Sequence, residues 1–180
     1  YTGQPTVDVK NNGKIQTLSI DEYIKGVVAA EMPANFELEA LKAQAVAART
    51  YALYQQERKG SLTTDFQTDQ AWLSKEELRK RWGFFQSFKL WRKVSQAVEE
   101  TRGEVLVFGG KPIFAAYHST CGGQTEDAQV VWGNSLPYLK SVKCKYCRES
   151  PRYRQELDFS THDLAVATGI DLSAQAVRSM

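Results

Sequence analysis

Short runs typical of β-strands flank two turn motifs in this chain. Asn11-Asn12-Gly13 and Gly109-Gly110-Lys111-Pro112 contain residues that tolerate the backbone angles of a tight turn. Each motif therefore predicts a β-hairpin. The paired runs are residues 6–10 with 14–18 and residues 104–108 with 113–117.

Apolar residues recur every three or four positions in longer segments, which is the period of a helix. Ser19 and Glu22 have the spacing of a capping box at a helix start, and Gly60 follows a basic last turn. We expect one further short strand at residues 138–142 and loops elsewhere. The chain is therefore predicted to be α+β, with several helices packed with β-hairpins around a cleft. The predicted helices are residues 20–32, 36–59, 75–82, 88–102 and 163–169.

Composition narrows the class of protein. With 180 residues, 42% apolar and 24% charged, the chain has the make-up of one globular domain. A net charge of +2 provides no strong basic field, so we expect no nucleic-acid partner. No run of about 18 apolar residues is present to span a bilayer. Because the chain begins with Tyr1, we expect it to be a trimmed part of a longer protein.

Glu31 is the most informative single residue. It continues the apolar series of Ile20, Ile24 and Val27, so the face that carries the core also carries a carboxylate. Burial and the negative end of the helix dipole both disfavour the ionised form. A carboxyl group that stays protonated near neutral pH is what a general acid needs. The alternative is a structural Glu31 that is paired with Arg49.

Lys42 and Arg49 are seven residues apart and share one helix face. This pair is either a solvated basic stripe or a cationic wall beside Glu31 that holds an acidic or heavily hydroxylated ligand. An adjacent arginine would lower the pKa of Glu31 and so oppose the effects of burial and of the helix dipole. Gln70 has the character of an ordinary polar loop residue.

Reactive residue types are concentrated in Tyr117-His118-Ser119-Thr120-Cys121-Gly122-Gly123. A serine or cysteine nucleophile with His118 or His162 as its base is one interpretation. Neighbouring residues on a strand point to opposite faces, which is poor geometry for a catalytic triad. We therefore favour hydroxyl groups and hydrogen-bond donors that line a polar cleft.

Three cysteines leave two alternatives open. Cys144 and Cys147 form a lone C-x-x-C pair, and two ligands do not make a zinc site. Cys121 and His118 could complete such a site in three dimensions. In an oxidising compartment, a disulfide among the three cysteines is at least as well supported.

Several motifs together resemble the family of stage II sporulation protein D and its relative, the amidase enhancer. The resemblance covers most of the chain, from the first hairpin to Cys147. Its motifs are residues 23–33 (YIKGVVAAEMP), 41–52 (LKAQAVAARTYA), 117–119 (YHS), 122–126 (GGQTE), 131–133 (VWG) and 137–139 (PYL).

This resemblance implies a lytic transglycosylase of endospore-forming bacteria. Such an enzyme cleaves the β-1,4 bond between N-acetylmuramic acid (MurNAc) and N-acetylglucosamine (GlcNAc) in glycan strands without stem peptides. It leaves 1,6-anhydro-MurNAc ends during forespore engulfment. The implied partner is the amidase stage II sporulation protein P with its membrane-anchor complex. The implied location is extracytoplasmic, anchored at the septal and engulfing membrane, with residues 1–180 as the soluble catalytic ectodomain.

The resemblance also assigns residues. The catalytic glutamate of the family falls on Glu31, which would serve first as acid and then as base. Its active-site lysine and arginine fall on Lys42 and Arg49. We count Gln70 and Tyr117-His118-Ser119 as further substrate-binding residues.

Two departures and two rival hypotheses accompany this assignment. Some relatives bind zinc through a loop that here reads Thr64–Trp72 without any cysteine or histidine, so we predict no metal and no cofactor. Relatives also continue past Met180, so part of the cleft is expected to lie beyond this chain. One rival is a non-catalytic activator of a cell-wall amidase, and the other is a hydrolase that uses Cys121.

Overall fold

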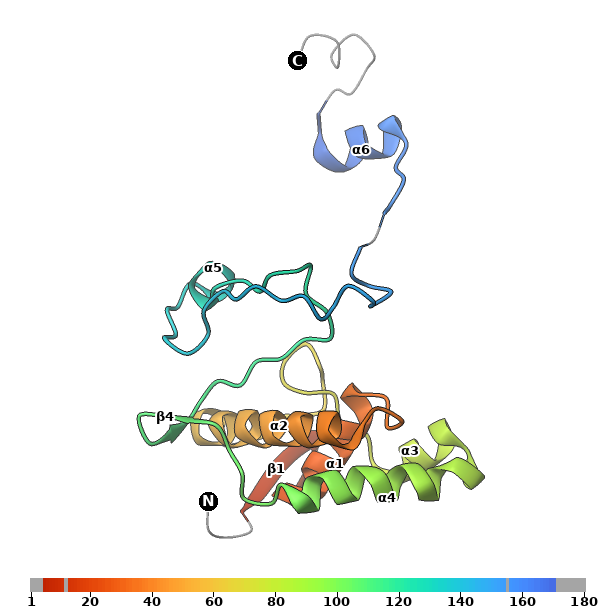
Figure 1. The fold of residues 1–180 in the computed structure, drawn as a ribbon, viewed down its shortest axis with the longest axis vertical. Coiled ribbons are helices and arrows are strands. Elements are labelled where there is room, and N and C mark those ends of the chain that lie inside the picture. Colours follow the sequence, from red (N-terminus) through yellow and green to blue (C-terminus); the bar gives the residue numbers. More distant parts are fainter. Residues whose placement is uncertain (1–4, 12, 155, 171–180) are drawn as a thin grey trace. The chain divides into compact units, whose positions relative to one another are not determined.

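A computed structural model describes residues 5–11, 13–154 and 156–170 of the chain (Figure 1). The chain divides into two compact units, residues 1–117 and residues 118–180. The helices, hairpins and small sheets of the chain confirm the predicted α+β class.

The first hairpin is formed as predicted. Strand β1 (Thr6–Asn11) pairs antiparallel with β2 (Lys14–Ser19), and Gly13 has the positive φ of 78° that the turn requires. Asn12 of the predicted turn lies outside the described residues. Strand β3 (Leu62–Thr63) adds to β1 in parallel, so the sheet order is β2-β1-β3. The sequence did not predict β3, since it spans two residues.

Four helices make up most of the first unit. They agree with the predicted segments, except that the fourth begins at Phe84 rather than Phe88. The Ser19 side chain caps the first helix by accepting from the Glu22 N–H, and Gly60 ends the second in the left-handed conformation. Figure 1 shows the second and fourth helices running alongside each other. The helices are α1 (Ile20–Glu31), α2 (Leu38–Lys59), α3 (Lys75–Trp82) and α4 (Phe84–Glu100).

The core of the first unit lies between the sheet and these helices. Alanines on the inner face of α2 allow α1 and α4 to approach its backbone closely. Burying a valine or leucine side chain contributes about 1.5–3 kcal/mol, so this cluster is the main source of the unit's stability. Its members include Val7, Val9, Ile24, Val27, Val28, Leu41, Ala45, Ala48, Leu62, Leu78, Val94 and Val98.

The second hairpin is shorter than predicted. Only β4 (Val107–Phe108) and β5 (Lys111–Pro112) pair as strands, around the turn at Gly109 and Gly110. Residues 113–117 are not a strand, although the Ile113 N–H still donates to the Leu106 carbonyl at 3.1 Å. Pro112 explains part of this difference, since it has no N–H to donate to a ladder.

The second unit has little regular structure. It contains α5 (Ala128–Trp132), which the sequence did not predict, and α6 (Thr161–Thr168), which matches the predicted 163–169 helix. The predicted strand at 138–142 is wrong, because these residues lie in a turn and in irregular backbone. Within the described part of this unit, an isolated bridge pairs Gln124 with Lys143. Among its described residues only Cys121 and Ala128 are buried. Throughout the described residues, no helix combines the length and apolar character needed to cross a membrane.

Candidate functional site

Glu31 is the last residue of α1 and its side chain is exposed. The prediction of a buried carboxyl is therefore wrong. Periodicity places Glu31 on the core-facing side of the helix, but the chain becomes extended at Met32 and the core ends before Glu31 is covered. An exposed carboxyl group is accessible to a ligand, which a buried one would not be.

Two groups hold the Glu31 carboxylate. The backbone N–H of Ala71 donates to Oε1 at 2.8 Å. The hydroxyl group of Tyr117 also interacts with Glu31. The pKa of Tyr117 is raised, first by burial and then by the negative charge of Glu31, so the phenol stays protonated. Glu31 is thus oriented by two neutral donors.

Gln70 fixes Tyr117. Its Nε2 donates to the Tyr117 hydroxyl oxygen at 3.0 Å, and its side chain is 2% exposed. Within the described residues, the Oε1 of Gln70 and the hydroxyl of Tyr23 are buried without a hydrogen-bond partner. The pKa of Tyr23 is raised by burial and then by Asp69 and Tyr117. Gln70 is therefore a buried partner of Tyr117 rather than an ordinary loop residue, and substrate binding by Gln70 and Tyr117 stays a prediction.

Aspartate carboxylates fix the backbone of the loop at residues 64–72. Asp69 accepts from the Thr63 backbone N–H at 2.9 Å and pairs with Lys59 at 2.8 Å. Asp65 accepts from the backbone N–H of Gln67 at 3.0 Å. These bonds fix the loop backbone, and with it the Ala71 N–H that contacts Glu31.

A glycine on α1 allows this loop to approach the helix. A Cβ on Gly26 would lie 2.3 Å from Nε1 of Trp72 and 2.7 Å from the Leu73 carbonyl oxygen. Real Cβ atoms never come this close, so Gly26 is required for the indole to rest on α1. This contact seats the loop against the helix that carries Glu31.

Arg49 belongs to α2 and contacts the first turn of α1, at the end opposite Glu31. Its guanidinium is 2% exposed and donates to the carbonyls of Val98 and Glu104 at 3.1 and 3.2 Å. It also pairs with Asp21 at 3.6 Å, and Arg102 pairs with the same carboxylate at 2.8 Å. Burial lowers the pKa of Arg49, which nevertheless stays charged.

The predicted cationic wall beside Glu31 is therefore wrong for Arg49, and so is the predicted Glu31–Arg49 pair. Asp21 and Glu31 are about 15 Å apart along the helix, at 1.5 Å per residue. Arg49 instead joins α1, α2 and the end of α4.

Lys42 is engaged at the surface. Its Nζ lies 2.6 Å from Glu100 and 2.8 Å from Glu39. Hydrogen bonds to these two carboxylates, Glu100 first, raise the pKa of Lys42. Lys42 thus also binds the end of α4, and contact with a substrate stays a prediction.

The unit boundary passes through the Tyr-His-Ser segment. Tyr117 ends the first unit, while His118 and Ser119 begin the second and are exposed. The described geometry thus unites Glu31, Gln70 and Tyr117. Substrate binding by His118 and Ser119 stays a prediction, as does a cleft that closes over Glu31.

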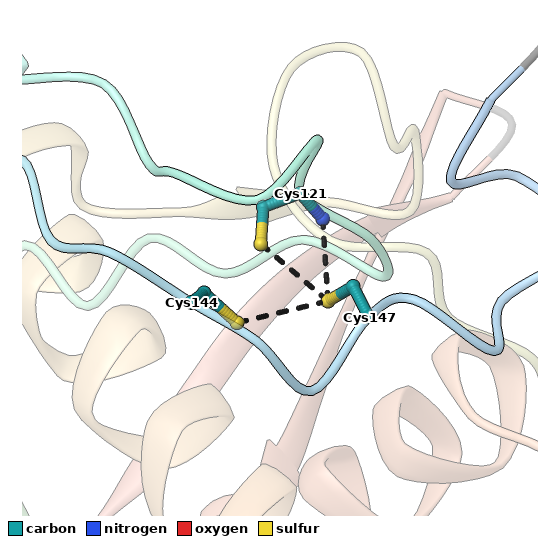
Figure 2. Close-up of side chains that lie close together, drawn as sticks. All are labelled: Cys121, Cys144 and Cys147. Atoms are coloured by element: carbon teal, nitrogen blue, oxygen red, sulfur yellow. Dashed lines mark hydrogen bonds between the residues drawn. The ribbon is translucent and has the colours of Figure 1, made fainter.

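The three cysteines converge in the second unit (Figure 2). The Sγ atom of Cys147 lies 3.5 Å from that of Cys121 and 3.9 Å from that of Cys144. All three are free thiols in the structure.

A groove of about 1010 Å³ lies between α3 and α4. Aromatic residues such as Phe85, Phe88 and Trp91 line it, together with Arg79. Glu31 is not among its lining residues, so this groove is separate from the candidate site.

Three contributors to the site were missed by the sequence predictions. Tyr23 was not singled out, although it opens the YIKGVVAAEMP motif. The contribution of Ala71 comes from its backbone N–H, which its side chain does not reveal. Asp69 could have been found, since an aspartate in a loop next to a polar turn often bonds backbone N–H groups.

Comparisons with known proteins identify the family of the chain. Residues 9–108, more than half of the chain, match the family described as stage II sporulation protein (SpoIID). The chain belongs to this family, which includes stage II sporulation protein D.

Two relatives carry that name, one from Bacillus amyloliquefaciens and one from Bacillus subtilis. Each is 40% identical over 172 residues, which is 92% of this chain and 50% of the relative. The amidase enhancer of Bacillus subtilis is 40% identical over 120 residues, 67% of this chain and 15% of that protein. The chain thus spans about half the length of the sporulation proteins it matches.

Proposed function

We propose that this chain is the catalytic part of a lytic transglycosylase. It cleaves the MurNAc-β-1,4-GlcNAc bond of peptidoglycan glycan strands that have lost their stem peptides. The observation that carries the proposal is an exposed Glu31 carboxyl, oriented by the Ala71 N–H and adjacent to the Gln70-supported phenol of Tyr117. Family membership supports the biological setting, which is sporulation and the cell wall.

The reaction needs one group that both gives and takes a proton. Protonated Glu31 donates its proton to the glycosidic oxygen as the bond to GlcNAc breaks. The resulting carboxylate then takes the proton of the muramic 6-hydroxyl, whose oxygen bonds the anomeric carbon. The product is a 1,6-anhydro ring, and Glu31 returns to its protonated state without consuming water.

A second catalytic carboxylate would favour ordinary hydrolysis instead. Asp69 in the loop has a fully buried side chain that is bound to Thr63 and Lys59. Asp21 lies at the far end of α1 between two arginines. These two acids are therefore engaged in contacts of the fold.

Tyr117 would act as a donor during this reaction. Its raised pKa keeps the phenol protonated, so it stabilises the carboxylate that Glu31 becomes after the first proton transfer. Gln70 keeps the ring in place through its hydrogen bond to the hydroxyl. We therefore assign Tyr117 the role of stabilising the Glu31 carboxylate, and Gln70 the role of positioning Tyr117.

The proposed setting is the space outside the cytoplasmic membrane during forespore engulfment. There the protein would be membrane-anchored at the septum and would degrade strands stripped by the amidase stage II sporulation protein P. The support is membership of the sporulation family and 40% identity to stage II sporulation protein D.

Mass spectrometry of digested glycan strands tests the proposal. Peptide-free strands incubated with the chain should give products that end in 1,6-anhydro-MurNAc. Glu31→Gln should abolish them, while Glu22→Gln, an exposed glutamate at the other end of α1, should not. Reducing-end products, or anhydro products that persist in Glu31→Gln, would overturn the proposed mechanism.

A second candidate function is activation of a cell-wall amidase without catalysis. It is favoured by the similarity to the amidase enhancer. Release of stem peptides from intact peptidoglycan, measured with and without the chain, tests it. Stimulation that is equal for the wild type and Glu31→Gln, with no anhydro products from either, would favour the activator.

A further inference from the structure

The three thiol groups of the second unit form a compact triangle (Figure 2). Cys121 comes from the glycine-containing loop, whereas Cys144 and Cys147 come from a turn more than 20 residues later. Their Sγ atoms all lie within 4.8 Å of one another. Among the described residues, this is the group of side chains that could hold a metal ion.

The spacing of the sulfur atoms fits a tetrahedral site. With metal–sulfur bonds of about 2.3 Å, two sulfurs of a tetrahedron are roughly 3.8 Å apart. The two shorter separations here, 3.5 and 3.9 Å, lie on either side of that value. Small side-chain movements would therefore be enough to bind one ion at the centre of the triangle.

Backbone N–H groups point to the sulfur atoms as they do in thiolate sites. Cys144 receives hydrogen bonds from the backbone of Tyr146 and Cys147, and Cys121 receives one from Gly123. The N–H of Cys121 in turn donates to the Cys147 sulfur at 3.4 Å. Such donors stabilise negative charge on sulfur and orient the ligands.

Backbone pairing fixes the two segments that carry the cysteines. The Cys144 N–H donates to the Gly123 carbonyl at 2.9 Å, and the Thr125 N–H donates to the Val142 carbonyl at 2.9 Å. The Ser150 N–H closes the turn by donating to the Cys147 carbonyl at 2.9 Å. The triangle therefore results from the local fold of this unit.

Few apolar side chains are buried in the described part of the second unit. Its described part buries only Cys121 and Ala128, so hydrophobic burial contributes little. Small units of this kind depend on disulfides or structural metal ions. The cysteine triangle is the place in this unit where such a cross-link would join distant segments.

We propose that Cys121, Cys144 and Cys147 bind one zinc ion, with a water molecule or an exogenous ligand in the fourth position. Each thiol releases its proton to solvent when its sulfur binds the ion. Three thiolates and Zn²⁺ leave a charge of −1, which is offset by the exposed Lys143, Lys145 and Arg148 in the same segment. This site revises the expectation of no metal and is separate from the Thr64–Trp72 loop.

Metal binding by the whole chain tests the proposal. The chain is purified with reductant and without chelator, and its zinc content is measured by elemental mass spectrometry. We expect about one zinc ion per chain. Titration with cobalt should produce thiolate-to-cobalt charge-transfer absorption, which reports sulfur ligands directly and needs no variant.

Variants locate the ligands. Cys144→Ser and Cys147→Ser should each weaken zinc binding by about 100-fold or more, whereas Asn134→Ser, exposed in the same unit, should bind as the wild type does. A fully reduced chain that binds neither zinc nor cobalt would overturn the proposal. So would a disulfide between two of these cysteines in chain purified with zinc and without reductant.

Discussion

The two ends of helix α1 carry carboxylates with opposite surroundings. Asp21, in the first turn, is buried and lies between Arg49 and Arg102. Glu31, in the last turn, is exposed and is held by one backbone N–H and the neutral hydroxyl of Tyr117. A buried carboxylate between two arginines contributes to the fold, whereas an exposed one that is held by neutral donors is accessible to a ligand.

This difference teaches how one helix connects stability with chemistry. Arg49 pairs with Asp21 and donates to the carbonyls of Val98 in α4 and Glu104 after it, so it joins the start of α1 to the end of α4. At the other end, the Trp72 indole rests on Gly26, which places the Ala71 N–H at Glu31. The Asp21 end of α1 therefore contributes to the fold, whereas the Gly26–Trp72 contact positions the groups around Glu31.

Removing the arginine should have the largest effect on stability. Arg49→Met leaves a buried carboxylate with one partner fewer and removes the guanidinium donors to the Val98 and Glu104 carbonyls, which costs about 3–5 kcal/mol. Urea denaturation measures the loss, and transglycosylase activity per folded molecule should stay close to wild type. Normal stability combined with lost activity would instead assign Arg49 to substrate binding.

Removing the hydroxyl group of Tyr117 should have an intermediate effect. It should lower activity at the Glu31 end of α1. Tyr117→Phe deletes a hydrogen bond to a charged group, worth about 1.5–3 kcal/mol, so kcat should fall by roughly 10- to 100-fold. KM should change little if Tyr117 controls the proton and does not bind sugar. A large rise in KM with unchanged kcat would contradict that role.

A side chain at Gly26 should have the smallest net effect on stability. Gly26→Ala forces Trp72 and Leu73 to move, at a cost of about 1–3 kcal/mol, while the helix gains about 1 kcal/mol from alanine. Thermal unfolding should show a small loss and activity a clear one. Adding Trp72→Ala should recover part of the stability. An equally active Gly26→Ala would show that the loop does not position Glu31.

The sequence predicted features that depend on neighbouring residues. The first hairpin, the Ser74–Glu77 capping box and the Gly60 helix end all follow from local turn and cap chemistry. Strand β3 was missed, because its pairing with β1 joins residues more than 50 positions apart.

The candidate site was predictable only in part. The helix period identified the face of α1 that carries Glu31, but not where the core ends, so the exposure of Glu31 was missed. The contact with Ala71 spans 40 residues and comes from a backbone group, which no side-chain pattern encodes. Arg49 was found by its motif, yet its role depends on the end of α4.

One paired measurement tests the central claim most directly. Glu31→Gln and Asp21→Asn are compared in the same two assays, formation of 1,6-anhydro-MurNAc products and the free energy of unfolding. We predict that Glu31→Gln loses product formation by about 100-fold or more with unchanged stability. Asp21→Asn should lose stability and keep activity per folded molecule. Product formation that survives in Glu31→Gln would contradict the account.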